Sequence, residues 1–233
     1  GPEGYGLYSL LEAFFQLGTI FTGAALADAS IKYISEYNEK GEKEKVQKIF
    51  DFSFSFIFIA ITFVSFIFIV FYPLFKTYFL SKEVVFSYYS LFAASFVGNT
   101  LSSTVFSPLL TGFKQIKKIV SRTLINSFFS LVSVVLLVFF FDLTGFFLSA
   151  ALASFFGLYL FWKEGSKLVK VRVSYPEFIT EIGKKLLSFF SMNFLLGITW
   201  MGSSYLQRIL VVNRLNIASL GLFSAATSLN RYL

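Results

Sequence analysis

The sequence predicts an all-α membrane protein with six transmembrane helices and the start of a seventh. Hydrophobic residues make up 56% of the chain and charged residues only 14%, whereas soluble domains usually carry about 25% charged residues. Five long stretches contain no charged residue, and a helix needs about 20 apolar residues to cross a bilayer. These stretches are residues 52–75, 84–113, 123–141, 143–162 and 186–207.

Glycine, proline and charged residues divide the chain into spans. The opening GPEGYG is expected to be a loop, and a charged linker around Gly41 separates the first two spans. Residues 142–144 form so short a turn that the spans on either side are expected to be antiparallel neighbours. The spans are expected at about residues 7–35, 47–72, 83–111, 116–141, 143–163, 180–212 and, in part, 216–233.

Basic residues gather in alternate linkers and so indicate the orientation of the chain. Residues 36–48, 112–122 and 163–185 are rich in Lys and Arg, whereas the other connections contain few. Cytoplasmic loops of membrane proteins carry an excess of these residues. We therefore expect a multi-pass cell-membrane protein with residue 1 outside and these three linkers in the cytoplasm. The net charge of +7 is then explained without a nucleic-acid partner.

Residue types needed for several kinds of catalysis are absent from the sequence. The chain contains no Cys and no His, which excludes thiol chemistry, disulfides and histidine acid–base catalysis. No Gly-rich phosphate loop, HExxH, GxSxG, DxD or paired-carboxylate motif occurs, and the linkers are too short for a catalytic domain. We therefore expect a protein that is not an enzyme and that holds no cofactor or metal.

Polar side chains share one face of four predicted spans, because residues three and four apart lie on the same side of a helix. Polar and charged groups at membrane depth tend to face a protein interior or a watery cavity. We expect these four spans to line a hydrophilic cavity, with spans 47–72 and 143–163 facing more lipid. The candidate cavity residues are Glu12, Gln16, Asn99, Arg122, Asn126, Asn193, Ser204 and Arg208. Each asparagine taken singly has a second interpretation, a hydrogen bond between helices.

Two sets of charged residues each have two interpretations. Asp28 and Lys32 lie four residues apart, so they form either a structural ion pair or a gate that breaks and re-forms during transport. Arg122 and Arg208 either extend to opposite membrane interfaces or recognise phosphate through the two-pronged guanidinium group.

Two features of the spans predict local packing. A small residue recurs at every fourth position of span 143–163, as Gly145, Ser149, Ala153 and Gly157. Such a ridge lets a neighbouring helix approach closely. Pro108 is expected either to kink span 83–111 or to end it.

Two stretches resemble the polysaccharide flippases of the multidrug/oligosaccharidyl-lipid/polysaccharide (MOP) exporter superfamily. The opening GPEGYGLY resembles the G-x-x-x-YG-x-Y loop of this family, and the basic residue that follows is Lys32, with Tyr33, Glu36 and Tyr37 after it. The stretch SYLQRILVVNRLNIASLGLFSAATSLN resembles the seventh span of the family and the G-x-Y-S-x-A start of the eighth. Its matching residues are Gly221, Phe223, Ser224 and Ala226.

The resemblance implies one lobe of a two-lobed carrier, so that this chain would be an internal piece lacking the first span and the second lobe. It implies that a polyprenyl- or dolichyl-pyrophosphate-linked oligosaccharide is flipped across the cytoplasmic membrane by alternating access, for polysaccharide export. The implied partners are membrane lipid, this lipid-linked oligosaccharide and a coupling ion, H⁺ or Na⁺, and the transporter is expected to act as a monomer. Gln207 precedes Arg208 where family members often have an acid, which leaves ion coupling through that position open.

Two other functions fit part of the pattern. A cation-coupled drug exporter of the same superfamily needs buried acids, and the deep spans offer Glu12 and Asp28. A membrane enzyme that polymerises or ligates glycans would need a large external loop. Asparagines and cations outnumber acids in the spans, which favours an anionic cargo that carries sugar.

Overall fold

The computed structural model describes residues 1–23, 25–80, 84–174 and 181–229, which contain helices and no strand. This confirms the predicted all-α class. The first half contains α1 (Pro2–Phe21), α2 (Leu26–Glu39), α3 (Lys43–Val70), α4 (Tyr72–Tyr78), α5 (Phe86–Leu101), the π-helix η1 (Ser102–Phe106) and α6 (Ser107–Gly112). The second half contains α7 (Ile116–Gly165), α8 (Glu181–Arg214) and α9 (Ile217–Leu229).

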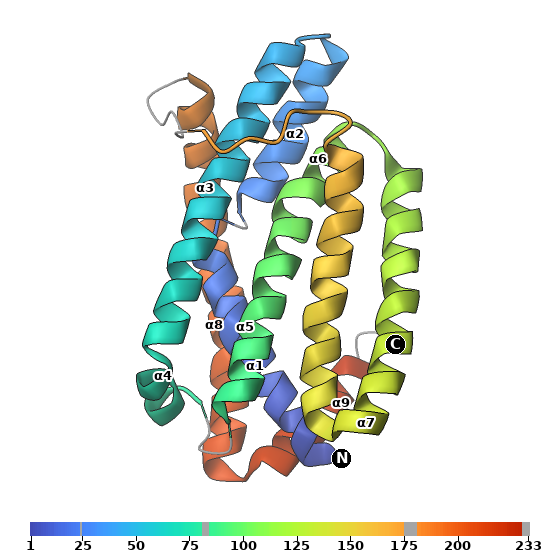
Figure 1. Cartoon of the computed structure of the whole chain (residues 1–233). Coiled ribbons are helices and arrows are strands. Elements are labelled where there is room, and N and C mark those ends of the chain that lie inside the picture. The colour runs from blue at the N-terminus through green and yellow to red at the C-terminus, as the bar shows by residue number, and fades with distance from the viewer. Residues whose placement is uncertain (24, 81–83, 175–180, 230–233) are drawn as a thin grey trace.

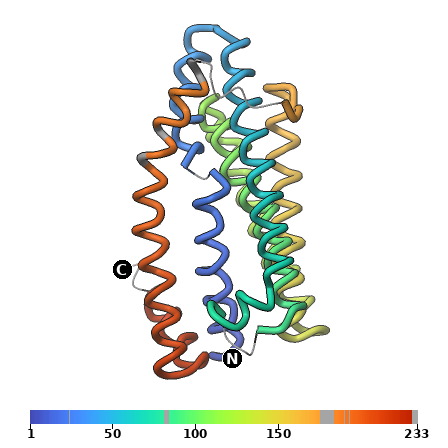
Figure 2. Tube along the Cα trace, turned by 90° about the vertical axis from the view of Figure 1, so that its left-hand side faces the viewer, coloured from blue at the N-terminus to red at the C-terminus, as the bar shows by residue number. Residues whose placement is uncertain are grey.

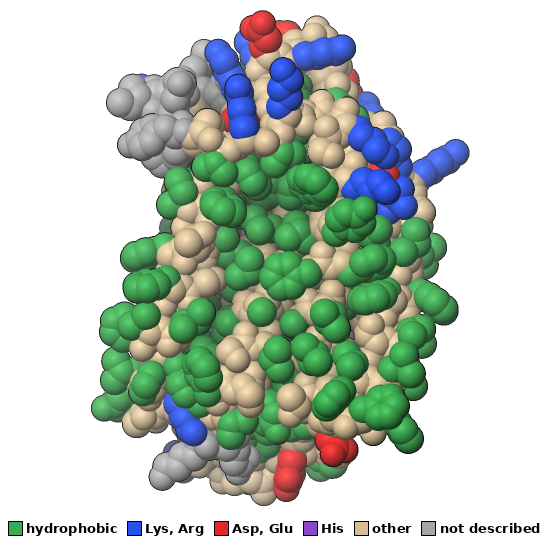
Figure 3. All heavy atoms as spheres, in the orientation of Figure 1, with side chains coloured by type: hydrophobic (Ala, Val, Ile, Leu, Met, Phe, Trp, Pro, Cys, Tyr) green, Lys and Arg blue, Asp and Glu red, His purple; other side chains and the backbone are tan. Residues whose placement is uncertain are grey.

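The long helices form an elongated bundle (Figure 1). Lys and Arg side chains gather at one end of the face in Figure 3, above a broad hydrophobic band. This end contains the turn at residues 40–43 and both ends of α7, and we call it the lysine-rich end. The opposite end contains the starts of α1 and α9.

Three helices among the described residues are long and apolar enough to cross a membrane. They are α3, α7 and the part of α8 from Gly183 to Arg214, and α1 with α2 makes a fourth if this bent pair is one broken span. Length and composition therefore identify three or four membrane-crossing helices. The predicted count of six spans and the start of a seventh stays a prediction.

The first predicted span, 7–35, differs from the structure at both of its ends and in its middle. The opening GPEGYG is not a loop, because α1 already begins at Pro2, and proline is favoured in the first turn of a helix, where its missing N–H is not needed. The span is also broken, with α1 and α2 bent by 52°. Gly23 lies at this break with φ +87°, a conformation in which side chains with a Cβ are strained.

The rod of α5, η1 and α6 shows how Pro108 is accommodated. Pro108 lies at the start of α6, and the five residues before Ser107 form the wider π-helix η1. The amide of Ser107 donates a hydrogen bond to the carbonyl of Ser102, five residues back. A π-segment of this kind absorbs the irregularity that proline introduces into a helix.

Helix α7 is a hairpin of two antiparallel arms, residues 116–141 and 143–165, as the short turn predicted. Asp142 has φ 49° and ψ −130°, and the chain reverses there (Figure 1). The rings of Phe129 and Phe156 lie 4.3 Å apart across the two arms. Close to the turn, a Cβ built on Gly145 would fall onto the carbonyl oxygen of Leu137. The first residue of the predicted small-residue ridge is therefore where the two backbones touch.

Aromatic side chains form the centre of the bundle between α1, α3 and α5. The ring of Phe15 lies 4.8 Å from that of Phe68 and 5.2 Å from that of Tyr89. All three side chains are buried, and the Tyr89 hydroxyl donates to the carbonyl of Phe68 at 2.9 Å. Helix α3 therefore packs in the core on one side, although its span was expected to face more lipid.

Helices α1 and α9 are in direct backbone contact at the opposite end of the bundle. A Cβ on Gly6 would fall onto the carbonyl oxygen of Ile217, and a Cβ on Gly221 would fall onto that of Pro2. One turn further on, the hydroxyls of Ser9 and Ser224 lie 2.5 Å apart. These residues belong to the two stretches that carry the resemblance, so the structure packs both stretches against each other.

We predict that Gly145→Ala destabilises the protein, because the new methyl group would displace the backbone of the opposite arm. Overpacking of this kind costs roughly 1–3 kcal/mol. Thermal unfolding in one detergent would measure the effect. Gly202→Ala in α8 is the matched control, since nothing lies within 4 Å of its Cβ position. Equal unfolding temperatures for the two variants would contradict the close contact in the hairpin.

Candidate functional site

A polar cavity of about 280 Å³ lies among α1, α5 and both arms of α7. Ligand pockets commonly have volumes of about 300–1,000 Å³, so this cavity is slightly smaller than that range. Its lining contains aromatic rings together with hydroxyl, amide and carboxyl groups. The lining residues are Tyr8, Glu12, Phe15, Gln16, Thr19, Phe92, Ser95, Phe96, Asn99, Thr100, Asn126, Ser130, Ala150, Ala153 and Ser154.

Half of the candidate cavity residues line this space. Glu12 and Gln16 come from α1, Asn99 from α5 and Asn126 from the first arm of α7. The structure thus brings together residues from three of the four spans expected to line a cavity. The second arm of α7, expected to face more lipid, also contributes side chains.

The candidates on α8 lie elsewhere. Asn193 and Ser204 are half-buried, and among the described residues no side chain of α8 lines the cavity. Arg208 is only 12% exposed and binds α1 instead. Its Nη1 donates to the carbonyl of Ser9 at 2.9 Å and lies 3.5 Å from Oε2 of Glu12. Arg208 therefore fixes α8 to the wall of the cavity, beside the carboxylate that lines it.

Asp28 and Lys32 lie on α2, beyond the bend that separates it from α1. Both side chains are exposed. The ammonium group of Lys32 lies 5.3 Å from the ring centroid of Tyr33, a cation–π distance. The gate pair assigned to Asp28 and Lys32 stays a prediction.

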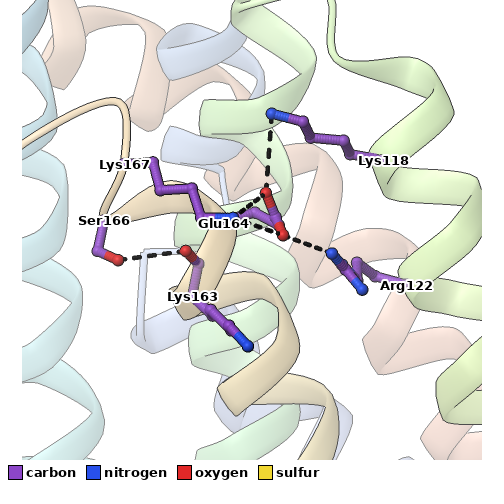
Figure 4. Close-up of polar contacts among 6 residues, drawn as sticks. All are labelled: Lys118, Arg122, Lys163, Glu164, Ser166 and Lys167. Carbon is purple, nitrogen blue, oxygen red and sulfur yellow. Dashed lines mark hydrogen bonds and ion pairs between the residues drawn. The ribbon is translucent and has the colours of Figure 1, made fainter.

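Arg122 lies outside the cavity and binds Glu164, a residue that the sequence did not single out (Figure 4). Arg122 Nη2 donates to Glu164 Oε1 at 2.5 Å. Lys167 Nζ lies 3.0 Å and Lys118 Nζ 3.7 Å from Oε2 of the same carboxylate. Only 2% of the Glu164 side chain is exposed, because these cations cover it. We call these four residues the Glu164 cluster.

The Glu164 cluster joins the open ends of the α7 hairpin. Lys118 and Arg122 are on its first arm, whereas Glu164 is at the end of its second and Lys167 follows it. In the sequence, Glu164 is one of three acids among the basic residues of 163–185, and nothing there distinguishes it from the other two. Its partners on the first arm are far away along the chain, so only the fold identifies them.

A second ionic contact attaches the segment after α7 to the surface of α3. Gln47 exchanges two hydrogen bonds with the backbone of Lys170, at 2.7 and 2.9 Å. Arg172 then binds Asp51 at 2.8 Å, and the amide of Ser174 donates to Ser55 at 2.9 Å. Asp51 raises the pKa of Arg172 by accepting its hydrogen bond.

These three contacts recur regularly because the spacing of the partners on α3 matches the spacing of the partners on the segment. The partners on α3 are four residues apart, which is about 6 Å along a helix. Those on the segment are two residues apart, which is about 6.6 Å in extended backbone. The two repeats match, so residues 170–174 lie along α3 at the lysine-rich end, where Figure 1 shows this segment crossing the helix.

We predict that Glu164→Gln loosens the α7 hairpin, because three cations would then surround a neutral group. The expected loss of unfolding free energy is roughly 1–3 kcal/mol, limited because Lys118 and Lys167 can turn to water. Thermal unfolding at constant detergent concentration would measure it. Glu36→Gln is the control, since its ion pair with Lys40 is exposed and exposed pairs contribute little. A Glu164→Gln variant as stable as this control would show that the cluster does not hold the hairpin.

The comparison with known protein families adds to this geometry. A family model described as "Polysaccharide biosynthesis protein" matches residues 1–233. No curated protein and no solved structure matches the chain. The family match covers both stretches that the structure packs together at Gly6 and Gly221. The chain therefore belongs to the polysaccharide biosynthesis protein family, that of the MOP-superfamily polysaccharide flippases.

Proposed function

We propose that this chain is part of a transporter that flips a polyprenyl- or dolichyl-pyrophosphate-linked oligosaccharide across the cytoplasmic membrane, for polysaccharide export. The observation that carries this proposal is the polar cavity among α1, α5 and α7. Sugar and phosphate cannot cross hydrocarbon unaided, because their polar groups would lose hydrogen bonds to water. Hydroxyl and amide groups in the cavity can replace those bonds.

The orientation is part of the same proposal. The lysine-rich end would face the cytoplasm, since basic loops remain on that side, and residue 1 would be outside. The rod of α5–η1–α6 and the two arms of α7 would each cross the membrane. Together with the α1–α2 pair, α3 and α8 they would make six spans, and α9 would be the start of a seventh.

Alternating access would use the contact between α1 and α9. Gly6 and Gly221 close the bundle at the opposite end from the lysines, beyond the cavity. Figure 2 shows α1 between α8 on one side and α3 with α7 on the other. A movement of α8 and α9 away from α1 would open this end of the bundle toward the outside.

The chemistry of the cavity distinguishes this function from that of a cation-coupled drug exporter. Glu12 is the only acid among the described lining residues, and it already lies 3.5 Å from Arg208. A binding site for cations would need a carboxylate that is free of such a partner. The neutral amides of Gln16, Asn99 and Asn126 suit a sugar instead.

We predict that Gln16→Ala and Asn99→Ala reduce transport without reducing the amount of protein. Each removes a hydrogen-bonding group from the cavity, and a lost bond of this kind costs about 1 kcal/mol, or roughly fivefold in binding. The full-length protein would be expressed in a host lacking its own flippase, and surface polysaccharide would be measured. Thr62→Ala, on an exposed part of α3, is the control. Failure of the unaltered protein to restore polysaccharide in a host with a matching glycan would reject the function itself.

We also predict that a disulfide between Ser9→Cys and Ser224→Cys stops transport. The chain contains no cysteine, so the pair would form in an otherwise unreactive background. Oxidation should lock α9 to α1 and abolish export, and a reductant should restore it.

The pair Ser30→Cys and Ser53→Cys provides the matched control. These two hydroxyls lie 2.9 Å apart between α2 and α3, within the part of the bundle that is not proposed to open. This second disulfide should form equally well and leave export unchanged. Undiminished export by the oxidised Ser9→Cys/Ser224→Cys protein would exclude opening at this contact, even if the unaltered protein flips its substrate.

A further inference from the structure

The Glu164 cluster contains more positive than negative charge. Lys118, Arg122 and Lys167 surround one carboxylate, so two positive charges remain uncompensated. Lys163 does not add to this excess, because it points away from Glu164 in Figure 4 and lies over the ring of Tyr159. Three cations that share one carboxylate leave a net positive charge, which attracts a further anion.

The cations are held in place but remain accessible. Their side chains are 56% exposed for Lys167, 40% for Lys118 and 29% for Arg122. The buried Glu164 therefore fixes the ends of three side chains that could otherwise point in any direction. Cations organised in this way lose less conformational freedom when they bind an anion.

One donor of the cluster lacks an acceptor. The Nε atom of Arg122 is buried and has no hydrogen-bond partner among the described residues. Arg122 uses Nη2 for Glu164, so its buried Nε–H is left without an acceptor beside the cluster. Arginine commonly binds phosphate through two of its N–H groups.

The surface below the cluster is apolar. On the helix face that continues Lys118 and Arg122, the first arm of α7 exposes Ile125, Val132 and Leu136 at 41%, 38% and 54%. Figure 3 shows the basic side chains above such hydrophobic surface. An anion that binds here and also carries hydrocarbon would contact both surfaces. A soluble anion would use only the first.

We propose that the Glu164 cluster binds the phosphate headgroup of an anionic phospholipid in the leaflet on the lysine-rich side. The acyl chains lie along the first arm of α7, and the phosphate bridges Lys118 and Lys167 beside Arg122. Basic sites between membrane helices on the cytoplasmic side bind anionic headgroups in this way. The site is separate from the cavity, and the inference does not depend on transport.

Native mass spectrometry of the purified full-length protein tests the proposal. The protein would be titrated with phosphatidylglycerol and, separately, with phosphatidylcholine of the same acyl chains. We expect phosphatidylglycerol to be retained preferentially. Lys118→Gln/Lys167→Gln should weaken its binding roughly 25-fold, since each cation near an anionic headgroup contributes a factor of about five.

Two further variants separate recognition from a general effect of charge or a failure to fold. Lys43→Gln/Lys48→Gln removes two exposed lysines from the lysine-rich end outside the cluster and should leave binding unchanged. Lys118→Arg/Lys167→Arg keeps the charges around Glu164 and should retain most of the binding. Equal losses in the two glutamine variants would overturn the proposal. So would displacement of phosphatidylglycerol by inorganic phosphate at similar concentrations, which would make the ligand a soluble anion.

Discussion

The backbone contact between Gly6 and Gly221 is the constraint on which the arrangement of this bundle depends. Helices in a membrane gain little from burying apolar side chains, because lipid is equally apolar. They associate through close packing and polar contacts instead. The absence of both Cβ atoms lets α1 and α9 touch, and the hydroxyls of Ser9 and Ser224 meet one turn away. Helix α1 also lines the cavity, so this contact sets the position of a cavity wall relative to α9.

The lysine-rich end is organised by a different kind of interaction. Two acids of low exposure, Glu164 and Asp51, each hold cations that come from another part of the chain. Glu164 joins the two arms of α7, and Asp51 with its neighbours holds residues 170–174 on α3. The two ends of the bundle thus differ physically: ionic contacts fix one end, and a close contact between glycines closes the other.

Much of the fold could be predicted because hydropathy and turn residues act locally. The reversal at residues 142–144 and the irregularity at Pro108 both follow from the residues present there. The start of α1 and the break at Gly23 could not be predicted so well. Glycines near residue 1 are typical of a loop, but in the structure they allow α9 to pack on a helix. A single glycine in an apolar run fits either a continuous or a broken helix, and tertiary packing of α1 and α2 selects the break.

The sequence by itself determined the membrane class, the family and the polar faces of α1, α5 and the first arm of α7. Hydropathy, short motifs and the polar face of a helix depend on residues that are close together in the sequence. Glu12, Gln16, Asn99 and Asn126 could therefore be assigned to a shared cavity. Only the tertiary structure decided that Arg122 binds Glu164 and that Arg208 binds α1 beside Glu12. A charged side chain in a low-dielectric bundle takes the partner that the fold places within reach, and that partner is distant along the chain.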